Sequence, residues 1–522
     1  MSDEVLGRVL DDRARSRPDH PLLICDADTL TYSAAAERST RLARALIALG
    51  AGKGTHIGLL YPNGAEFVVA AAAAARIGAV VVPFSTFATA RELREQLVHA
   101  DVRILLAAGR YRHHDYRERL AGILGVIPAP DPTTPLLNPD VPQLRHIVFD
   151  GTGLDPLTDT VGPELLAALQ DDVYGSDVLS LIYTSGSTGA PKGVLHTHEA
   201  LLAHQSGLNE VRGLTAADRL FCNSPFFWVG GFAYALLATL VAGSTLVCSN
   251  AEDAGATLDL IERVRPTTTN GFDAGVAHLA RHPSFGDRDL SFLRRGNLYS
   301  LMAPGLRPKD RELRHNMLGM TEAGSVVLLS GDESDQPEHR RGSFGRPAPG
   351  IEIRIAEAAT GAAVPAGETG ELWVRGRNLM LGYHKRSREQ SFEPDGWLRT
   401  GDLARVDAEG YVYFLGRRGS MIKTGGANVA PAEVEKAIAT VTGGVAAHVL
   451  GLPDPERGQI VAAVLVAGDR AVPAAAALRD RLRTELSAYK IPRRFVTVPA
   501  ADIPLRSSGK IDIHRLGELF DA

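Results

Sequence analysis

Residues 181–198 read LIYTSGSTGAPKGVLHTH, and this stretch says more about the chain than any other. An apolar strand is predicted over residues 178–183, followed by a loop rich in Thr, Ser and Gly that ends at Lys192. Such a loop presents backbone N–H groups, hydroxyls and an ammonium group, which together suit a phosphate. The common P-loop is excluded, because it has four residues between its glycines and a Ser or Thr after its lysine. Here two residues separate Gly186 from Gly189, and Gly193 follows Lys192. A flexible Gly/Ser turn is the alternative interpretation.

Length and composition indicate a large globular protein. A chain of 522 residues predicts roughly three to four structural units. Hydrophobic residues make up 45% and charged residues 22%, which excludes wholesale disorder. The net charge of −5 gives no reason to expect nucleic acid as a partner. The three cysteines, Cys25, Cys222 and Cys248, lie far apart and form no CxxC pair, which predicts a reducing compartment without disulfides or a zinc site.

Neither a secretory signal nor a membrane span is expected. The first fifteen residues contain acidic side chains and no long apolar run. The most hydrophobic stretch, residues 67–84, includes Arg76 and Gly78, so a buried helix followed by a buried strand explains it better than a membrane span. We therefore expect a soluble, cytoplasmic protein, either a monomer or a homodimer.

The order of apolar segments predicts an α/β fold. Amphipathic runs at residues 38–49 and 91–99 alternate with apolar runs at 56–61, 79–83 and 102–107, as in parallel sheets covered by helices. Short strands and turns over residues 351–375 predict a β-rich subdomain. After a composition shift at GRRGS (residues 416–420), a helix at 431–439, strands at 448–451 and 460–466, and a helix at 474–486 predict a small α+β domain. The predicted domains are residues 1–417 and 418–522.

Four further segments follow the glycine-rich loop. They are Leu318-Gly319-Met320-Thr321-Glu322, Trp397-Leu398-Arg399-Thr400-Gly401-Asp402, the run GRRGSMIKTGGANVAPAEVE at residues 416–435, and the run IPLRSSGKIDIHRL at residues 503–516. In this order and spacing, the five motifs resemble those of the adenylate-forming (ANL) superfamily, which includes acyl-CoA synthetases, peptide-synthetase adenylation domains and beetle luciferases. The resemblance covers nearly the whole chain.

The resemblance implies a two-step reaction that uses ATP, Mg²⁺ and, as a co-substrate, CoA. A small-molecule carboxylic acid, fatty or aromatic, first joins the α-phosphate of ATP with release of pyrophosphate, and the thiol of CoA then displaces AMP. Positioning and charge neutralisation supply most of the catalysis in such chemistry. The implied enzyme is an AMP-forming acid–thiol ligase.

The resemblance also implies roles for individual residues. Thr321 would contact the α-phosphate, Glu322 and Thr188 would hold Mg²⁺, and Asp402 would accept hydrogen bonds from the ribose hydroxyls. Lys510 would bridge the substrate carboxylate and the α-phosphate. The implied catalytic residues are Lys510, Glu322, Thr321 and Thr188. The implied ATP-binding residues are Thr184, Ser185, Gly186, Ser187, Thr188, Gly189, Lys192, Ala303, Leu318, Gly319, Met320, Thr321, Asp402, Arg417 and Lys510.

Members of this superfamily rotate the small domain between the two half-reactions, here about a hinge near Gly419. The rotation would bring either the Lys510 loop or the face at residues 423–426 over the active site. Lys423, Gly425 and Gly426 would then contact CoA, since glycine has no Cβ to obstruct a pantetheine arm. A plain turn before a helix is the alternative interpretation of these glycines.

Three positions depart from the superfamily pattern. Leu318 replaces the aromatic residue that stacks on adenine, a contact worth roughly 1 kcal/mol. Residues 301–304 read LMAP instead of GGAP, and Gly419 replaces an Asp or Lys. A remodelled adenine pocket follows, whereas the charged catalytic groups are retained.

The acyl pocket would be lined by two segments, FFWVGGF at residues 226–232 and NGFDAGV at residues 270–276. Aromatic surface there is consistent with a fatty or aromatic acid, and for Phe226 a place in the core is an equal alternative. Asp273, where relatives often have Pro, would pair with an amino group on the substrate if it points inward. The expected lining residues are Phe226, Phe227, Trp228, Gly230, Gly231, Phe272 and Asp273.

Other functions within the superfamily stay open. The adenylate could pass to the pantetheine of a separate carrier protein, since no carrier domain follows Leu516. The chain could also activate nitrite or an amine, as in diazotisation of an aryl amine, or act as a silent binding protein. Retention of Lys192, Glu322, Asp402 and Lys510 argues against the last alternative.

Overall fold

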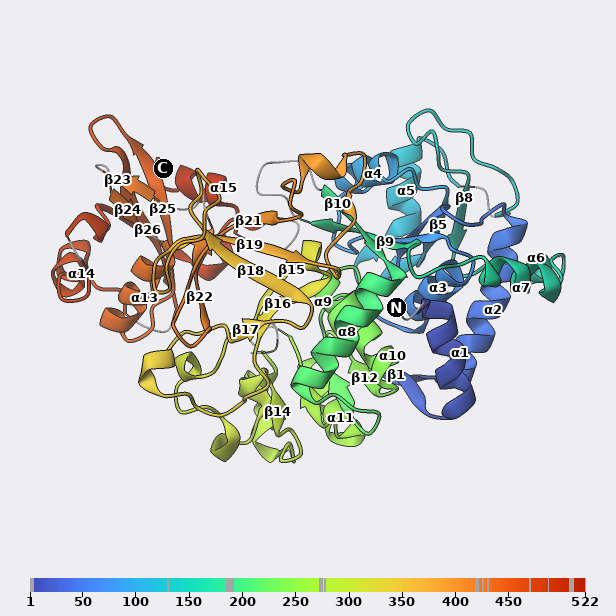
Figure 1. Ribbon diagram of the computed structural model, residues 1–522, viewed down its shortest axis with the longest axis horizontal. Coiled ribbons are helices and arrows are strands. Elements are labelled where there is room, and N and C mark those ends of the chain that lie inside the picture. The colour runs from blue at the N-terminus through green and yellow to red at the C-terminus, as the bar shows by residue number, and fades with distance from the viewer. Residues whose placement is uncertain are drawn as a thin grey trace. The chain divides into compact units, whose positions relative to one another are not determined.

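The computed structural model describes residues 4–128, 131–184, 192–271, 276, 278–417, 422–424, 427–429, 431–468, 471–486, 488–506 and 511–521. Contacts within the chain divide it into two compact units (Figure 1). The first comprises Met1–Glu352 and Arg375–Gly396, and the second Ile353–Val374 and Trp397–Ala522. None of the helices in the described ranges has both the length and the apolar character needed to cross a membrane.

The first unit contains a seven-stranded sheet that carries the glycine-rich loop. Its strand order is β20 (Gly382–Tyr383), β10 (Lys192–Thr197), β9 (Val178–Thr184), β4 (Val80–Pro83), β3 (His56–Leu60), β5 (Ile104–Ala107) and β8 (His146–Phe149). From β9 to β8 the neighbouring strands are parallel, whereas β10 pairs antiparallel with both β9 and β20. The predicted parallel sheet is therefore confirmed, with an antiparallel edge formed by the strands on either side of the loop.

A second, six-stranded sheet lies in the same unit. Its order is β14 (Arg295–Gly296), β13 (Thr268–Thr269), β11 (Arg219–Phe221), β12 (Thr245–Cys248), β1 (Pro21–Cys25) and β2 (Asp28–Thr31), and all neighbours but β1 and β2 are parallel. A three-stranded antiparallel sheet follows, formed by β15 (Leu318–Met320), β16 (Ser325–Leu329) and β17 (Arg346–Pro347). The short strands β6 (Arg110–Tyr111) and β7 (His114–Asp115) form a separate hairpin.

Helices surround these sheets. In chain order they are α1 (Leu6–Ser16), α2 (Tyr32–Ala48), α3 (Ala65–Arg76), α4 (Ala90–His99), α5 (Tyr116–Leu124), α6 (Asp155–Thr158), α7 (Pro163–Asp171), α8 (His198–Arg212), α9 (Val229–Gly231), the π-helix η1 (Phe232–Leu237), α10 (Ala238–Ala242) and α11 (Ala254–Val264). Figure 1 shows α1 and α2 side by side in blue, and both pack against α3. The side chains of α3 from Phe67 to Arg76 are buried.

The stretch at residues 67–84 is thus the predicted buried helix and strand, α3 and β4. The charged side chain of Arg76 in this stretch is bound by other side chains and not by solvent. Its guanidinium donates to both carboxylate oxygens of Asp11, at 2.9 and 2.5 Å, and to Ser39 Oγ at 2.9 Å. A buried cation is tolerated here because its donors have partners.

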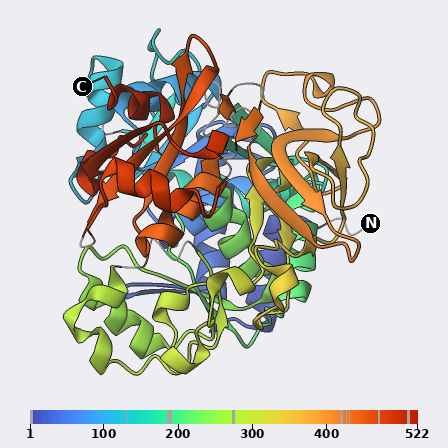
Figure 2. The same cartoon turned by 90° about the vertical axis from the view of Figure 1, so that its left-hand side faces the viewer.

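The second unit contains two sheets. The four-stranded sheet has the order β18 (Ile351–Ala356), β19 (Gly370–Gly376), β21 (Leu398–Val406) and β22 (Val412–Arg417), which confirms the predicted β-rich segment. The other has the order β24 (Ala427–Val429), β23 (Ile422–Thr424), β26 (Gly458–Ala467) and β25 (Ala447–Asp454), and β27 (Arg494–Pro499) also pairs with β26. Figure 2 shows these strands in orange and red.

The helices of the second unit are α13 (Pro431–Thr442), α14 (Ala475–Leu482) and α15 (Ile513–Glu518). Residues of α13, α14, β25 and β26 share one hydrophobic core, so the predicted α+β character is confirmed. The prediction for the second helix was four residues too long, because α14 ends at Leu482 and not at residue 486. Thr484, whose β-branched side chain disfavours a helix, lies in the turn that follows. The predicted boundary between residues 417 and 418 stays a prediction.

Candidate active site

The glycine-rich loop joins two paired strands. Thr184, at the end of β9, lies opposite Lys192, at the start of β10, and the pairing continues from Gly193 with Tyr183 to His196 with Ser180. Residues 185–191, which include Ser185, Gly186, Ser187, Thr188 and Gly189, lie outside the described residues. The two ends of the loop are therefore held by a sheet, and Thr184 and Lys192 are both partly exposed there.

Tyr383 connects Lys192 to Glu322. It lies on β20, beside Val194 of β10, and its hydroxyl donates to Glu322 Oε1 at 2.8 Å. The ammonium nitrogen of Lys192 lies 5.0 Å from the centre of the Tyr383 ring, within the range of a cation–π contact. One aromatic side chain thus touches the lysine of the loop and the acidic residue of the second motif.

The backbone around Thr321 and Glu322 is held from two sides. These residues begin the short 3₁₀ turn Thr321–Ala323, which follows β15. The buried His196 donates from Nε2 to the carbonyl oxygen of Thr321 at 2.7 Å, and the N–H of Met380 donates to the carbonyl oxygen of Glu322 at 2.8 Å. The structure therefore brings three of the predicted residues, Lys192, Thr321 and Glu322, into one network in the first unit.

The strand carrying Tyr383 is itself anchored at its far end. The Lys385 ammonium donates to Asp101 Oδ1 at 2.9 Å, and His384 Nε2 lies 3.3 Å from Asp101 Oδ2. The N–H of His384 donates to the carbonyl oxygen of Gly193 at 2.8 Å, so this segment follows the end of the glycine-rich loop. These contacts fix the backbone directly after Tyr383 and so help to position its hydroxyl.

The other predicted residues of the first unit lie near these. Leu318, Gly319 and Met320 form β15, which pairs with β16, and a Cβ on Gly319 would lie 2.8 Å from the carbonyl oxygen of Ser325. Gly319 is therefore required for strand packing whether or not it contacts a nucleotide. Ala303 is partly buried and directly precedes the 3₁₀ turn Pro304–Leu306.

The first predicted segment of the acyl pocket packs mainly inside the protein. Phe226 is 1% exposed and meets Phe67 edge-on, with ring centres 5.4 Å apart. Phe227 meets Phe87 in the same way at 5.7 Å, whereas Trp228 and Gly230 are partly exposed. A Cβ on Gly231 would lie 2.1 Å from the carbonyl oxygen of Pro225, so only glycine fits there. Phe272 and Asp273 lie outside the described residues.

In the second unit, Asp402 and Arg417 are directly opposite each other on β21 and β22. Asp402 is 7% exposed, and its N–H is bound by Thr400 Oγ1 at 3.0 Å. Lys423 lies on β23, where its backbone is opposite Asn428. Gly419, Gly425, Gly426 and Lys510 are outside the described residues as well.

The chemistry of Glu322 suits a hard cation. A carboxylate supplies oxygen ligands of the kind that Mg²⁺ prefers. The Tyr383 hydroxyl binds Oε1 and so orients the group, as the outer-shell partner of a metal-binding carboxylate does. Glu322 therefore fits the ion that the resemblance implies, whereas the other implied ligand, Thr188, lies outside the described residues.

Comparison with protein families gives two matches, one in each part of the chain. The model for the AMP-binding enzyme covers residues 10–384, and the model for the AMP-binding enzyme C-terminal domain covers residues 433–510. The chain belongs to the family of AMP-binding enzymes. The predicted adenylate-forming superfamily is thereby confirmed, and the motifs at residues 181–198 and 318–322 fall within the first match.

Individual relatives of this AMP-binding enzyme agree with the match. A feruloyl-CoA synthase from Amycolatopsis sp. is 32% identical over 98% of both chains. The crystal structure of an anthranilate CoA ligase in complex with anthranoyl-AMP aligns with a TM-score of 0.82 and 26% identity, covering 99% of this chain and 97% of that one. The o-succinylbenzoate CoA synthetase from Bacillus subtilis, solved with ATP and magnesium ion, aligns with a TM-score of 0.78 and 27% identity over 97% and 98%. The predicted enzyme class, an AMP-forming acid–thiol ligase, is confirmed by these relatives.

Sequence reasoning missed Tyr383 and His196. Both positions could have been noticed, because Tyr383 is a single aromatic residue directly after a glycine, and His196 is two residues from Val194 and so shares the buried face of the same strand. What could not be read from the chain is the partner of each residue, since the partners lie 61 and 125 positions away.

Proposed function

We propose that this protein activates a carboxylic acid with ATP, releases pyrophosphate, and transfers the acyl group from AMP to the thiol of CoA. The observation that carries the proposal is the network of Lys192, Tyr383 and Glu322 at the mouth of the glycine-rich loop. A cation and a carboxylate held at one loop can serve the two charge requirements of ATP, its phosphates and the accompanying ion. The family match and the named CoA ligases support the same reaction.

In the first half-reaction, Lys192 would bind the terminal phosphates and Thr321 the α-phosphate. Glu322 would hold Mg²⁺, which neutralises charge on the phosphates when bound. Tyr383 keeps one oxygen of Glu322 in place, so the remaining lone pairs are presented in a fixed direction. The backbone bonds from His196 and Met380 fix the turn that carries both residues.

In the second unit, Asp402 and Arg417 would bind the ribose and the rest of the nucleotide. Their register supports this assignment, because an acidic and a basic residue opposite each other on neighbouring strands can bind adjacent parts of one ligand. Lys510 would serve the adenylation step, and Lys423, Gly425 and Gly426 would serve thioester formation. These last roles, like those of residues 185–189, rest on the resemblance.

The test is pyrophosphate release from ATP and Mg²⁺ with a panel of fatty, benzoic, cinnamic and aminobenzoic acids, with and without CoA. We expect acid-dependent release, an acyl-CoA product by mass spectrometry, and loss of release in Lys510→Ala and Glu322→Gln. A variant of an exposed acid on α8, Glu210→Gln, is the matched control and should retain activity. Release of pyrophosphate without a thioester product would indicate that the acyl acceptor is a carrier protein or another nucleophile and not CoA. No release with any acid would contradict the proposal.

A further inference from the structure

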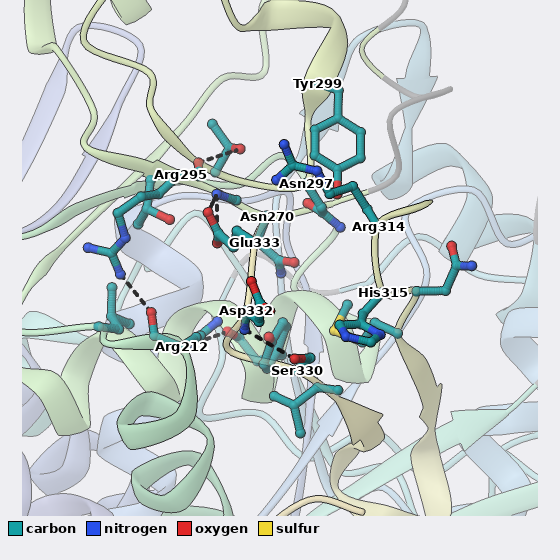
Figure 3. A pocket seen from close by; sticks show the side chains of 18 of the residues that line it. Arg212, Asn270, Arg295, Asn297, Tyr299, Arg314, His315, Ser330, Asp332 and Glu333 are labelled. Carbon is teal, nitrogen blue, oxygen red and sulfur yellow. Dashed lines mark hydrogen bonds between the residues drawn. The ribbon is translucent and has the colours of Figure 1, made fainter. Parts of the chain in front are cut away.

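A pocket in the first unit includes Asn270, the first residue of the second predicted acyl-pocket segment, and its other lining residues have no role assigned above. It is lined by Leu220 of β11 and by both residues of β13 and β14 together with those that follow them, Asn270 and Asn297, and it encloses about 100 Å³. Its walls come from the end of α8, from residues 314–317 before β15, from Leu329 at the end of β16, and from Ser330, Asp332 and Glu333 after that strand (Figure 3). Open α/β sheets bind ligands at the carboxyl ends of their strands, so the location favours a binding site.

The lining of this pocket is polar, which is unusual for a site that binds an organic acid. Ligand pockets are lined mostly by apolar side chains. Here hydrogen-bonding side chains outnumber apolar ones, and they include Asn270, Asn297, Ser330, Asp332 and Glu333. A ligand group that enters it must therefore make hydrogen bonds, because burying these side chains against a hydrocarbon would leave them without partners.

The three arginines of the lining already form hydrogen bonds within the protein. Arg212 donates to Asn209 Oδ1 at 2.8 Å, and Arg314 donates to Asp335 Oδ1 at 2.7 Å. Arg295 donates to the carbonyl oxygens of Arg212 and Gly213 at 2.6 and 2.8 Å, at the end of α8. These cations are committed to structural contacts, so they are poor candidates for binding an anionic ligand.

Asn297 and Asp332 are committed as well. The amide of Asn297 binds both the carbonyl and the N–H of Gly271, at 2.9 and 3.1 Å, and so fixes the start of the second predicted acyl-pocket segment. Asp332 accepts from the N–H and hydroxyl of Ser334 and from the amide of Gln336. These bonds lower the pKa of Asp332 to about 2 and leave it satisfied by its own turn.

Glu333 is different. Both of its carboxylate oxygens share one donor, the N–H of Gly296, at 3.0 and 3.2 Å, and no other donor to it is found in the described part of the chain. Figure 3 shows this carboxylate among the lining residues, beside Asn270. Glu333 as a whole is exposed, and the protein on one side of its carboxyl group raises the pKa of that group, mainly by removing solvent. A carboxylate can accept about four hydrogen bonds, so Glu333 has capacity for a donor on a ligand.

The pocket also lies at a suitable distance from Thr321, where the proposed reaction takes place. Met317 lines it, and Thr321 follows on the same chain after the three residues of β15. At about 3.3 Å per strand residue, these two positions are about 13 Å apart. An aromatic acid can span such a distance, with its carboxyl group near Thr321 and a ring substituent in the pocket.

We propose that the acid substrate is an aromatic or short acid whose far end carries a hydroxyl or amino group, and that Glu333 accepts a hydrogen bond from that group. The inference rests on the proposed function. The volume of the pocket, about 100 Å³, fits a substituent but not a long chain, because even a cavity of about 150 Å³ holds only a single benzene ring.

The experiment compares kcat/KM for matched acids: cinnamic with 4-hydroxycinnamic, benzoic with 4-hydroxybenzoic and 4-aminobenzoic, and octanoic acid as the alkyl case. With the wild-type enzyme, we expect the hydroxylated or aminated acid to be preferred by about 10- to 100-fold, the size of a hydrogen bond to a charged group. Glu333→Ala should abolish that preference and leave the unsubstituted acids at their wild-type rates. Glu333→Gln keeps an acceptor for Gly296 and should retain most of the preference for a hydroxyl group. Glu210→Gln should match the wild type.

The outcomes separate this inference from the function on which it rests. Preference for unsubstituted or alkyl acids, or an equal loss with all acids in Glu333→Ala, would overturn the inference and leave the ligase activity standing. Absence of pyrophosphate release with every acid would overturn both. Thermal unfolding of each variant identifies a loss that comes from misfolding, and the wild-type comparison tests the inference without any variant.

Discussion

The hydroxyl of Tyr383 donates a 2.8 Å hydrogen bond to Oε1 of Glu322, although the two residues are 61 positions apart in the chain. The bond exists because β20 pairs with β10, the strand that begins at Lys192. The ring of the same tyrosine lies under the Lys192 ammonium. Tyr383 is therefore a positioning residue for two groups that the proposed reaction needs.

Tyr383→Phe tests this role. The variant keeps the ring beside Lys192 and removes the donor to Glu322, so kcat/KM for adenylation should fall by about 10-fold or more. The Mg²⁺ concentration needed for half-maximal activity should rise, because Glu322 is no longer held in one orientation. Pyrophosphate release measured across a Mg²⁺ titration gives both quantities.

The control is Tyr32→Phe, which also removes one hydroxyl. In the wild type this hydroxyl donates to the carbonyl oxygen of Ser244 at 2.8 Å in the core. It should lower the free energy of unfolding and leave the Mg²⁺ dependence unchanged. If Tyr383→Phe has the Mg²⁺ dependence of the wild type, the positioning role is wrong.

The two glycines of the FFWVGGF segment, Gly230 and Gly231, should differ in how replacement by alanine changes stability. Gly231 has a helical backbone (φ −79°, ψ −46°) that alanine also adopts, but its Cβ would meet the carbonyl oxygen of Pro225. Gly231→Ala should therefore lower the free energy of unfolding by about 1–3 kcal/mol through overpacking. The neighbouring Gly230 has open space, so Gly230→Ala should change stability by less than about 1 kcal/mol. Urea unfolding of the two variants tests the contrast, and equal effects would contradict it.

The ion pair of Arg76 and Asp11 should contribute strongly to stability. The Arg76 side chain is 1% exposed, so Asp11→Asn would leave a buried cation with a weaker partner. We expect a loss of about 2–4 kcal/mol in the free energy of unfolding. Asp12→Asn is the matched control, because Asp12 pairs with Arg15 at the surface, where such pairs contribute about 0–1 kcal/mol. A loss of similar size in both variants would contradict the prediction.

Three buried histidines predict a loss of stability in acid. Burial lowers the pKa of His196, His198 and His204 to about 4, from 6.5 in an exposed setting. Between pH 6.5 and pH 4 the unfolded chain therefore binds more protons than the folded protein. The free energy of unfolding should fall as the pH is lowered through this range, by up to about 1.4 kcal/mol per pH unit for each histidine.

His198 offers a way to test that assignment. Its Nδ1 accepts the N–H of Leu6 at 3.1 Å, so protonation removes an acceptor as well as adding a buried charge. His198→Asn retains an acceptor and no longer titrates, and its stability should depend less steeply on pH than that of the wild type. His514→Asn, at a side chain that is 90% exposed, should leave the pH dependence unchanged. Denaturant unfolding at several pH values gives the slopes, and an unchanged slope in His198→Asn would contradict the assignment.

Much of the fold was predictable because local patterns specify local structure. The apolar run at residues 79–83 contains β4, and the run at 102–107 contains β5, since β-branched and aliphatic residues between turns favour a buried strand. The amphipathic run at 91–99 falls within α4, which begins with a capping box formed by Thr89 and Glu92. The end of α14 was missed by four residues, because the last turn of a helix depends on what it packs against as well as on propensity.

The candidate site was predictable in its residue types but not in its contacts. The motifs singled out Lys192, Thr321 and Glu322 by their order along the chain. Nothing in that order identified Glu333, because its significance comes from a single N–H donor on a neighbouring strand. For Phe226 the residue type left the pocket and the core as equal alternatives, and the structure shows its ring packed against Phe67.

The sequence by itself determined the family, the reaction class and the approximate position of most strands and helices. Those properties depend on residue types at short spacings, which a single chain displays. The tertiary structure decided which distant residues meet. Cys25 and Cys248 are 223 positions apart, yet they face each other across the parallel strands β1 and β12, and Cys222 follows β11 beside them. Such neighbours are set by strand order and register, which arise when buried surfaces from the whole chain pack together.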